Sequence, residues 1–283
     1  MTVRERRADF AALTFAALLT PVASWAQLDA AAEGPVAIGH HHFNTTDVEV
    51  SKRFWTLLGA QDVSLGPLTA LMLPNLIVAL TPKPADAVVE SSFGSSINHI
   101  GLQMPDVPSV LERLRDAGFA VVTKEHVPPA TGDVFEIDDQ NTRVAFVEAP
   151  SGARIELFEN PELEQAISNH HIHLYTPDPE ATRQWYIDLL GAEPRMRGSF
   201  LAADLPGVNL TFSEADTVPT PGRALDHIGF EIRDLAGFVA ILERQGIELD
   251  RPFTHIEAMG LSFAFLSDPW GTSIELTEGL DEL

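Results

Sequence analysis

The stretch His171-Ile172-His173-Leu174-Tyr175-Thr176-Pro177-Asp178 contains the pattern that decides the fold. A histidine seven residues before an aspartate, with a short apolar run between them, occurs four times in the chain. The pairs are His40 with Asp47, His99 with Asp106, His171 with Asp178, and His227 with Asp234. Four copies of one pattern indicate a repeated structural unit.

Each copy opens a module of about 45 to 60 residues, in which we expect a strand, a helix and three further strands. The aspartate is expected to cap the helix and a glycine to end it. The expected helices are residues 48–58, 107–117, 179–190 and 235–245. After the second and fourth helices we expect strands at residues 120–124 and 247–250, and residues 127–133 as a loop.

The four modules are of two kinds. Two residues after the repeat histidine, the first and third modules carry a second histidine, His42 and His173. The second and fourth modules carry Gly101 and Gly229 at the same place. The chain is therefore an A-B-A-B duplication.

Eight of the ten histidines obey this duplication, with offsets of 128 to 131 residues. The matched pairs are His40 with His171, His42 with His173, His99 with His227, and His126 with His255. A hydrogen-bonded strand residue is the alternative explanation for any one histidine. The matched set favours a functional role, because a core histidine could more readily have been replaced in one half.

One glutamate stands between apolar neighbours in the last strand of each B module, Glu156 and Glu275. A carboxylate at such a position is costly unless it is paired or bound to a cation. The A modules have Ala79 and Thr211 at the corresponding places. The sequence therefore predicts two metal sites, with ligands His40, His99 and Glu156 in one half and His171, His227 and Glu275 in the other.

Two imidazoles and one carboxylate on one face of a metal leave open positions, the arrangement of nonhaem Fe(II) oxygenases. Fe(II) or Mn(II) is the favoured cofactor, and Zn(II) or Ni(II) could also be accepted. His42 and His173 are candidates for either a further ligand or a general base. His126 and His255 complete the candidate catalytic residues.

Composition excludes several classes of partner. The chain of 283 residues has 18 Lys and Arg against 41 Asp and Glu, a net charge of −23. Such a surface repels phosphate backbones and anionic lipids, so we expect a small-molecule substrate and neither a nucleic acid nor a membrane partner. With no cysteine, disulfides and thiolate metal sites are excluded. We expect a monomer or a homodimer.

The first 26 residues have the composition of a secretory signal. Arg4, Arg6 and Arg7 precede an apolar run over residues 10–22, and small residues lead to Ala26. We predict cleavage after Ala26 and an exported, periplasmic or extracellular protein. The alternative is an uncleaved membrane anchor, for which the apolar run is short.

Together these features resemble the vicinal oxygen chelate superfamily, which includes glyoxalase I, bleomycin resistance proteins and extradiol dioxygenases. The aromatic pairs Phe54-Trp55 and Trp185-Tyr186 before Leu-Gly, and the Pro-x-Gly endings before each glutamate, carry the resemblance. It implies an α+β fold of four βαβββ modules paired into two half-open β-barrels. We expect the first and second modules to pair over residues 36–160, and the third and fourth over 167–279.

The resemblance leaves the reaction open. Glyoxalase-type isomerases use a glutamate from each paired module, and Ala79 and Thr211 count against that chemistry. The C-terminal half is more similar to extradiol dioxygenases, with His255 at the opening of their signature. Phe265, and Phe146 in the other half, stand where those enzymes have tyrosine.

Three hypotheses follow from these residues. The first is an exported metal-dependent oxygenase acting on a compound with vicinal oxygens. The second is a lyase or isomerase that uses the metal as a Lewis acid. The third is a noncatalytic protein that binds a ligand or a metal.

Overall fold

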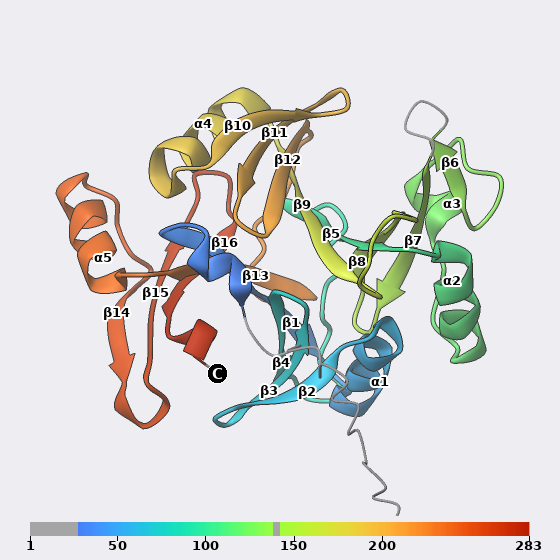
Figure 1. Ribbon diagram of the computed structural model, residues 1–283, viewed down its shortest axis with the longest axis horizontal. Helices are drawn as coiled ribbons and strands as arrows, with labels where there is room; N and C mark the ends of the chain where they lie inside the picture. Colours follow the sequence, from blue (N-terminus) through green and yellow to red (C-terminus); the bar gives the residue numbers. More distant parts are fainter. Residues whose placement is uncertain (1–27, 138–141, 283) are drawn as a thin grey trace, which may run out of the picture.

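The computed structural model describes residues 28–137 and 142–282, which form four βαβββ modules in an α+β fold (Figure 1). The proposed signal segment, residues 1–26, lies outside the described residues. No helix in the described ranges is long and apolar enough to cross a membrane.

The modules have the following elements. Module 1 comprises β1 (Val36–Thr45), α1 (Val48–Leu58), β2 (Gln61–Leu65), β3 (Leu68–Leu73) and β4 (Leu76–Pro82). Module 2 comprises β5 (Ile97–Met104), α2 (Val107–Asp116), α3 (Thr123–His126), β6 (Phe135–Ile137), β7 (Thr142–Ala149) and β8 (Ala153–Glu159). Module 3 comprises β9 (Ser168–Thr176), α4 (Pro179–Leu190), β10 (Glu193–Arg197), β11 (Phe200–Leu205) and β12 (Val208–Glu214). Module 4 comprises β13 (Leu225–Ile232), α5 (Leu235–Arg244), β14 (Arg251–Ile256), β15 (Leu261–Ser267) and β16 (Ser273–Glu278). Short 3-10 helices are η1 (Asp29–Ala32), η3 (Glu257–Met259) and η4 (Leu280–Glu282).

The repeat aspartates cap the four long helices, as predicted. Each side chain accepts a hydrogen bond from the backbone N–H three residues further on, as Asp178 does from Ala181. Such a cap satisfies a donor that the helix leaves unpaired and contributes about 1 kcal/mol. The four helices therefore begin where the repeat places them, directly after the first strand of each module.

The strands form two eight-stranded sheets. The first sheet has the order β14-β15-β16-β13-β1-β4-β3-β2 and joins modules 4 and 1. The second has the order β10-β11-β12-β9-β5-β8-β7-β6 and joins modules 3 and 2. In each sheet an A module meets a B module through one antiparallel strand pair, β1 with β13 and β5 with β9.

The expected pairing of module 1 with module 2, and of module 3 with module 4, is therefore wrong. Sheets form between modules that are distant in sequence, so neither sheet is contained in residues 36–160 or 167–279. The physical reason is that β5 and β13 open equivalent B modules. Both strands offer β1 the same kind of partner edge, and local sequence does not distinguish them.

Two expected strands are also misplaced. In module 2, residues 120–124 give only an isolated bridge between Val121 and Val147, followed by helix α3. In module 4, the strand expected at residues 247–250 begins instead at Arg251. The two B modules therefore differ most just after their long helices, and this difference affects two of the candidate histidines.

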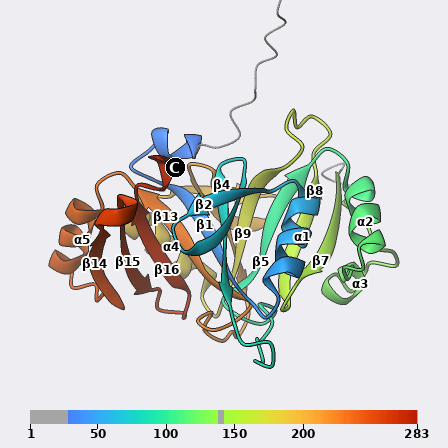
Figure 2. The same ribbon diagram turned by 90° about the horizontal axis from the view of Figure 1, so that it is seen from below.

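The two sheets lie side by side, with α5 at one end of the molecule and α2 at the other (Figure 2). One large hydrophobic core includes residues of both sheets and of the four long helices. Side chains of modules from different sheets also contact each other outside the strands. The ring of Phe54 in α1 packs against that of Phe119, just after α2, with centroids 5.1 Å apart. A buried hydrogen bond of 3.1 Å from the Tyr186 hydroxyl to Asp268 is another such contact. The sheets are thus packed into one body, and each carries its own histidine cluster.

Candidate metal centres

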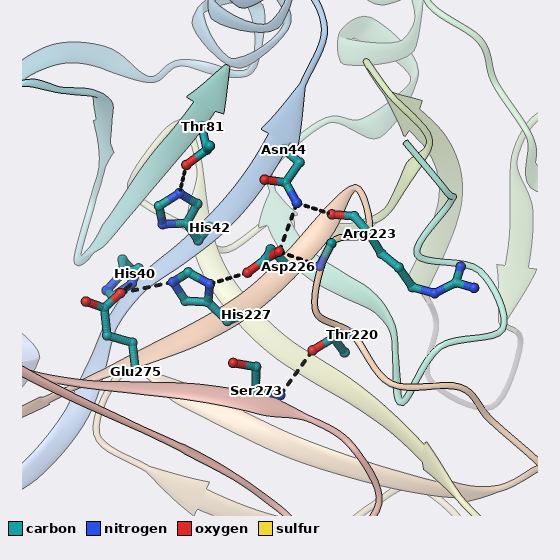
Figure 3. A network of polar contacts seen from close by, with 11 residues as sticks. His40, His42, Asn44, Thr81, Thr220, Arg223, Asp226, His227, Ser273 and Glu275 are labelled. Carbon is teal, nitrogen blue, oxygen red and sulfur yellow. Dashed lines mark hydrogen bonds and ion pairs between the residues drawn. The ribbon is translucent and has the colours of Figure 1, made fainter. Parts of the chain in front are cut away.

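The first cluster consists of His40, His42, His227 and Glu275 and lies within the first sheet (Figure 3). The Nε2 atoms of His40 and His227 each lie 3.0 Å from Glu275 Oε2. The ring of His42 packs against that of His227 with a centroid separation of 4.4 Å. Strands β1, β13 and β16 thus direct four possible ligands toward one point.

Hydrogen bonds behind His227 orient this ligand. Asp226 Oδ1 accepts a hydrogen bond from His227 Nδ1 at 2.7 Å. The other oxygen of Asp226 accepts from Asn44 Nδ2 and from the Gly222 N–H. A carboxylate that holds the far nitrogen of a histidine fixes both the ring and its tautomer, as in many metal sites. The near nitrogen of His227 is thereby directed at Glu275.

The protonation states of the first cluster follow from its burial and its charges. Burial opposes ionisation of Glu275, but hydrogen bonds from His227 and His40 hold the pKa of its carboxyl well below the usual range. Burial also lowers the pKa of His227, yet hydrogen bonds to Asp226 and Glu275 raise it overall. Burial, with repulsion from neighbouring imidazoles, lowers the pKa of His42 to about 3, so this ring is neutral near pH 7.

The second cluster consists of His99, His171, His173 and Glu156 within the second sheet. Glu156 Oε2 lies 3.0 Å from His99 Nε2 and 3.3 Å from His171 Nε2. The rings of His99 and His173 are 4.8 Å apart. Asn98 Oδ1 accepts from His99 Nδ1 at 2.9 Å, so Asn98 corresponds to Asp226 of the first cluster.

Both clusters have a donor set that fits a divalent cation. In the second cluster, the Nε2 atoms of His99 and His171 face each other at 3.3 Å, and both face one oxygen of Glu156. A single proton cannot satisfy all three contacts. In the first cluster, His40 Nδ1 is buried and has no hydrogen-bond partner among the described residues, while its Nε2 faces the carboxylate. Converging imidazole nitrogens with one carboxylate suit Fe(II), Mn(II), Zn(II) or Ni(II).

The expected ligands therefore converge, but in different groups. His40 meets His227 and Glu275 instead of His99 and Glu156. His171 correspondingly meets His99 and Glu156. The exchange follows from the pairing of β1 with β13 and of β5 with β9, which brings ligands of distant modules together.

The same pairing explains the glycines of the B modules. Gly229 lies opposite His40 in the sheet, and Gly101 lies opposite His171. A Cβ atom at either glycine would overlap the imidazole ring facing it. The B modules thus need a residue without a side chain where the A modules place a ligand ring.

The structure separates the remaining candidate histidines. His42 and His173 lie within the clusters, where their Nε2 atoms contact Thr81 Oγ1 at 2.5 Å and Ser213 Oγ at 2.8 Å. These two hydroxyl partners orient the second histidine of each A module.

The fourth matched pair, His126 and His255, does not keep equivalent positions. His126 stacks on Phe146, with its ring centroid 5.1 Å from that of His99, so it borders the second cluster. His255 does not reach either cluster, because it lies on β14, whereas His126 lies in α3. Its side chain is 45% exposed and contacts Ser262 and Glu257.

Sequence reasoning missed Asp226 and Asn98. A signal was present, because the B modules share a polar residue directly before the repeat histidine, as Asn98-His99 and Asp226-His227. The strand alternation that identified the ligands does not show that the preceding side chain turns back to the far ring nitrogen.

The first cluster opens into a cavity of about 700 Å³. Apolar side chains form much of its wall, among them Leu65, Leu261, Phe263 and Phe265. Lys83 and Arg251 also line it, and neither forms an ion pair within the described ranges. The Arg251 guanidinium lies 4.8 Å above the centroid of the Phe265 ring. This cavity, called the first cavity below, can therefore hold a small molecule with an apolar body.

Residues 168–276 match the model of the Glyoxalase/Bleomycin resistance protein/Dioxygenase superfamily. This part of the chain belongs to that superfamily. The match includes His171, His227 and Glu275, which the fold distributes over both clusters. No match was found among curated proteins compared by sequence.

Solved structures are similar in fold to most of the chain. Glyoxalase I from Zea mays is 17% identical, with a TM-score of 0.66 over 87% of this chain and 94% of that one. A candidate dioxygenase from Bacillus subtilis is 14% identical, with a TM-score of 0.63 over 86% and 84% of the two chains. At these identities the similarity establishes the shared fold alone.

Proposed function

We propose that the chain is a metal-dependent enzyme of this superfamily, most like a ring-cleaving dioxygenase, that acts in the first cavity. Its substrate is a small molecule that chelates the metal through two neighbouring oxygens. The observation that carries the proposal is the convergence of His40, His227 and Glu275 beside Ala79, which lines the same cavity. Because Ala79 offers no ligand, positions on the cavity side are left for a substrate.

The residues of the first cluster would hold the metal through two imidazole nitrogens and one carboxylate oxygen. A bound Fe(II) or Mn(II) would supply Lewis acidity and a site for oxygen chemistry. Leu65, Phe263 and Phe265 line the cavity and would pack against the apolar part of the substrate. The hydrogen bond between His42 Nε2 and Thr81 Oγ1 holds the His42 ring at the cluster, as either a fourth ligand or a proton acceptor.

A lyase or isomerase is the second candidate, and His42 is the observation that favours it. A neutral imidazole at a metal-binding cluster can accept a proton from a substrate carbon next to a coordinated carbonyl. The low pKa of His42 weakens it as a base, because general bases work best with a pKa near the operating pH. Glyoxalase-type isomerases also use a glutamate from each paired module, and Ala79 offers none, so we place the oxygenase first.

Export is also part of the proposal and is supported by the charge and apolar pattern of residues 4–26. Each cluster draws all its ligands from one chain, so a monomer would suffice for activity.

The test begins with metal-free protein reconstituted anaerobically with Fe(II), Mn(II), Zn(II) or Ni(II), followed by metal counting. Oxygen uptake is then measured with catechols. We expect uptake with Fe(II) or Mn(II) that is lost in Glu275→Ala. Glu156→Ala is the matched control, because it removes the equivalent carboxylate of the second cluster, and we expect it to retain turnover.

The other outcomes separate the alternatives. Turnover of an α-carbonyl substrate without oxygen consumption would identify a lyase or isomerase. Metal binding without turnover of either substrate class would indicate a binding protein. A protein that binds none of the four metals would refute the assignment of the clusters as metal sites.

A further inference from the structure

We propose that the two clusters are unequal metal sites, and that the first cluster binds a divalent cation more tightly than the second. The charges around equivalent ligands carry this inference. It rests on the proposed metal-dependent function, and it assigns Asp226 and Arg197 as the residues that set the order of metal loading.

The first difference lies behind the B-module histidine. His227 donates from Nδ1 to Asp226 at 2.7 Å, and His99 donates from Nδ1 to Asn98 at 2.9 Å. Both contacts place the proton on Nδ1 and leave Nε2 as the metal-facing atom, so ring and tautomer are fixed equally well. The two partners differ by one negative charge, which makes His227 the stronger ligand.

Asp226 is held firmly in this role. Its second oxygen accepts hydrogen bonds of 2.9 Å from Asn44 Nδ2 and 2.7 Å from the Gly222 N–H. These donors stabilise the ionised carboxylate without neutralising it. The negative charge is therefore fixed directly behind His227.

The second difference is a cation beside the second cluster. Arg197 donates from Nε to Thr211 Oγ1 at 2.9 Å, and its guanidinium lies 5.8 Å from the centroid of the Phe200 ring. Phe200 in turn contacts His173, with a centroid separation of 5.4 Å. The Arg197 charge interacts with Glu156 and opposes a positive ion at this cluster.

The first sheet has a leucine where the second has Arg197. Arg197 pairs with Phe200 across a hairpin, and the corresponding hairpin of module 1 pairs Leu65 with Leu68. Leu65 lines the first cavity as a neutral side chain.

Two cations line the first cavity, Lys83 and Arg251. The Arg251 guanidinium lies 4.8 Å from the centroid of the Phe265 ring, which is 5.2 Å from that of His227, but Arg251 is exposed to solvent, which screens its charge. Relative to the second cluster, the first has one more negative charge behind its ligands, and its hairpin places a leucine where Arg197 approaches the second cluster. Both differences favour a divalent cation in the first cluster.

The test is a calorimetric titration of the metal-free protein with Zn(II), in competition with a chelator. We expect two classes of site, each taking one ion. Glu275→Ala should remove the tighter class and Glu156→Ala the weaker one. Circular dichroism of each variant checks that the fold is retained.

Exchange variants then test the cause. Asp226→Asn should weaken the tighter class by about 10- to 100-fold, the usual effect of losing a partner of this kind. Asn98→Asp should tighten the weaker class by a similar factor. Arg197→Leu, which copies Leu65, should tighten the weaker class as well, and Thr211 keeps its contact to Asn209.

Two sites of equal affinity would overturn the inference while leaving the proposed function intact. The same holds if Glu156→Ala removes the tighter class, or if both Asp226→Asn and Asn98→Asp leave the two affinities unchanged. Absence of bound metal under all conditions would instead overturn the proposed function and this inference together.

Discussion

Glu231 gives a prediction that can be worked through from the structure. This side chain is 3% exposed in the first sheet. Its Oε1 accepts from the backbone N–H groups of Gly279 and Leu280, and its Oε2 accepts from the Thr277 hydroxyl. Burial nevertheless dominates and raises the pKa of Glu231 from 4.5 to about 7. We therefore expect Glu231→Gln to stabilise the protein at alkaline pH.

The sign and size of the effect follow from this shift. Between pH 4.5 and about 7 the folded state holds a proton that the unfolded state has lost. The stability that this protonated carboxyl contributes to the free energy of unfolding is complete below pH 4.5. It is lost as the pH rises from 4.5 through about 7. The full loss is about 3 kcal/mol, since one pKa unit corresponds to about 1.4 kcal/mol. Glutamine stays neutral at every pH and keeps an oxygen for the two N–H groups.

Urea unfolding of both proteins at about pH 5 and about pH 8 measures the difference. We expect similar stability at the lower pH, and a variant more stable by up to about 3 kcal/mol at the higher pH. Glu214→Gln is the matched control, because it removes the same charge from an exposed position. A stability difference between Glu231→Gln and the wild type that does not change with pH would refute the reasoning.

Three further predictions concern the cluster, the contact between sheets and the isolated histidine. Gly229→Ala should displace the His40 ring, remove metal from the first cluster in a metal count, and cost about 1 to 3 kcal/mol of stability from overpacking. Tyr186→Phe removes the buried hydroxyl that donates to Asp268. Urea unfolding should show that the free energy of unfolding falls by about 1 to 3 kcal/mol. His255→Ala should leave kcat/KM unchanged in the turnover assay, because this side chain lies outside both clusters; a loss of activity would contradict that placement.

Much of the fold could be predicted because its signals are local. A capping aspartate such as Asp178 acts within one helical turn, and a glycine such as Gly191 ends the helix in the left-handed conformation. The failures also have local causes. At His126 and His255 the spacing matched in both halves, but one segment folded as a helix and the other as a strand, so equal spacing did not give equal positions.

The sequence by itself determined the four modules and the residues that converge at the clusters, including His40, His227 and Glu275. Strand alternation places each of these side chains on one face, and the internal duplication marks which were kept in both halves. Only the tertiary structure decided that His40 meets Glu275 and not Glu156. Both B modules offer a glycine to the facing histidine of an A module, so this feature does not select the partner. The choice between partners depends on long-range packing, which local patterns do not encode.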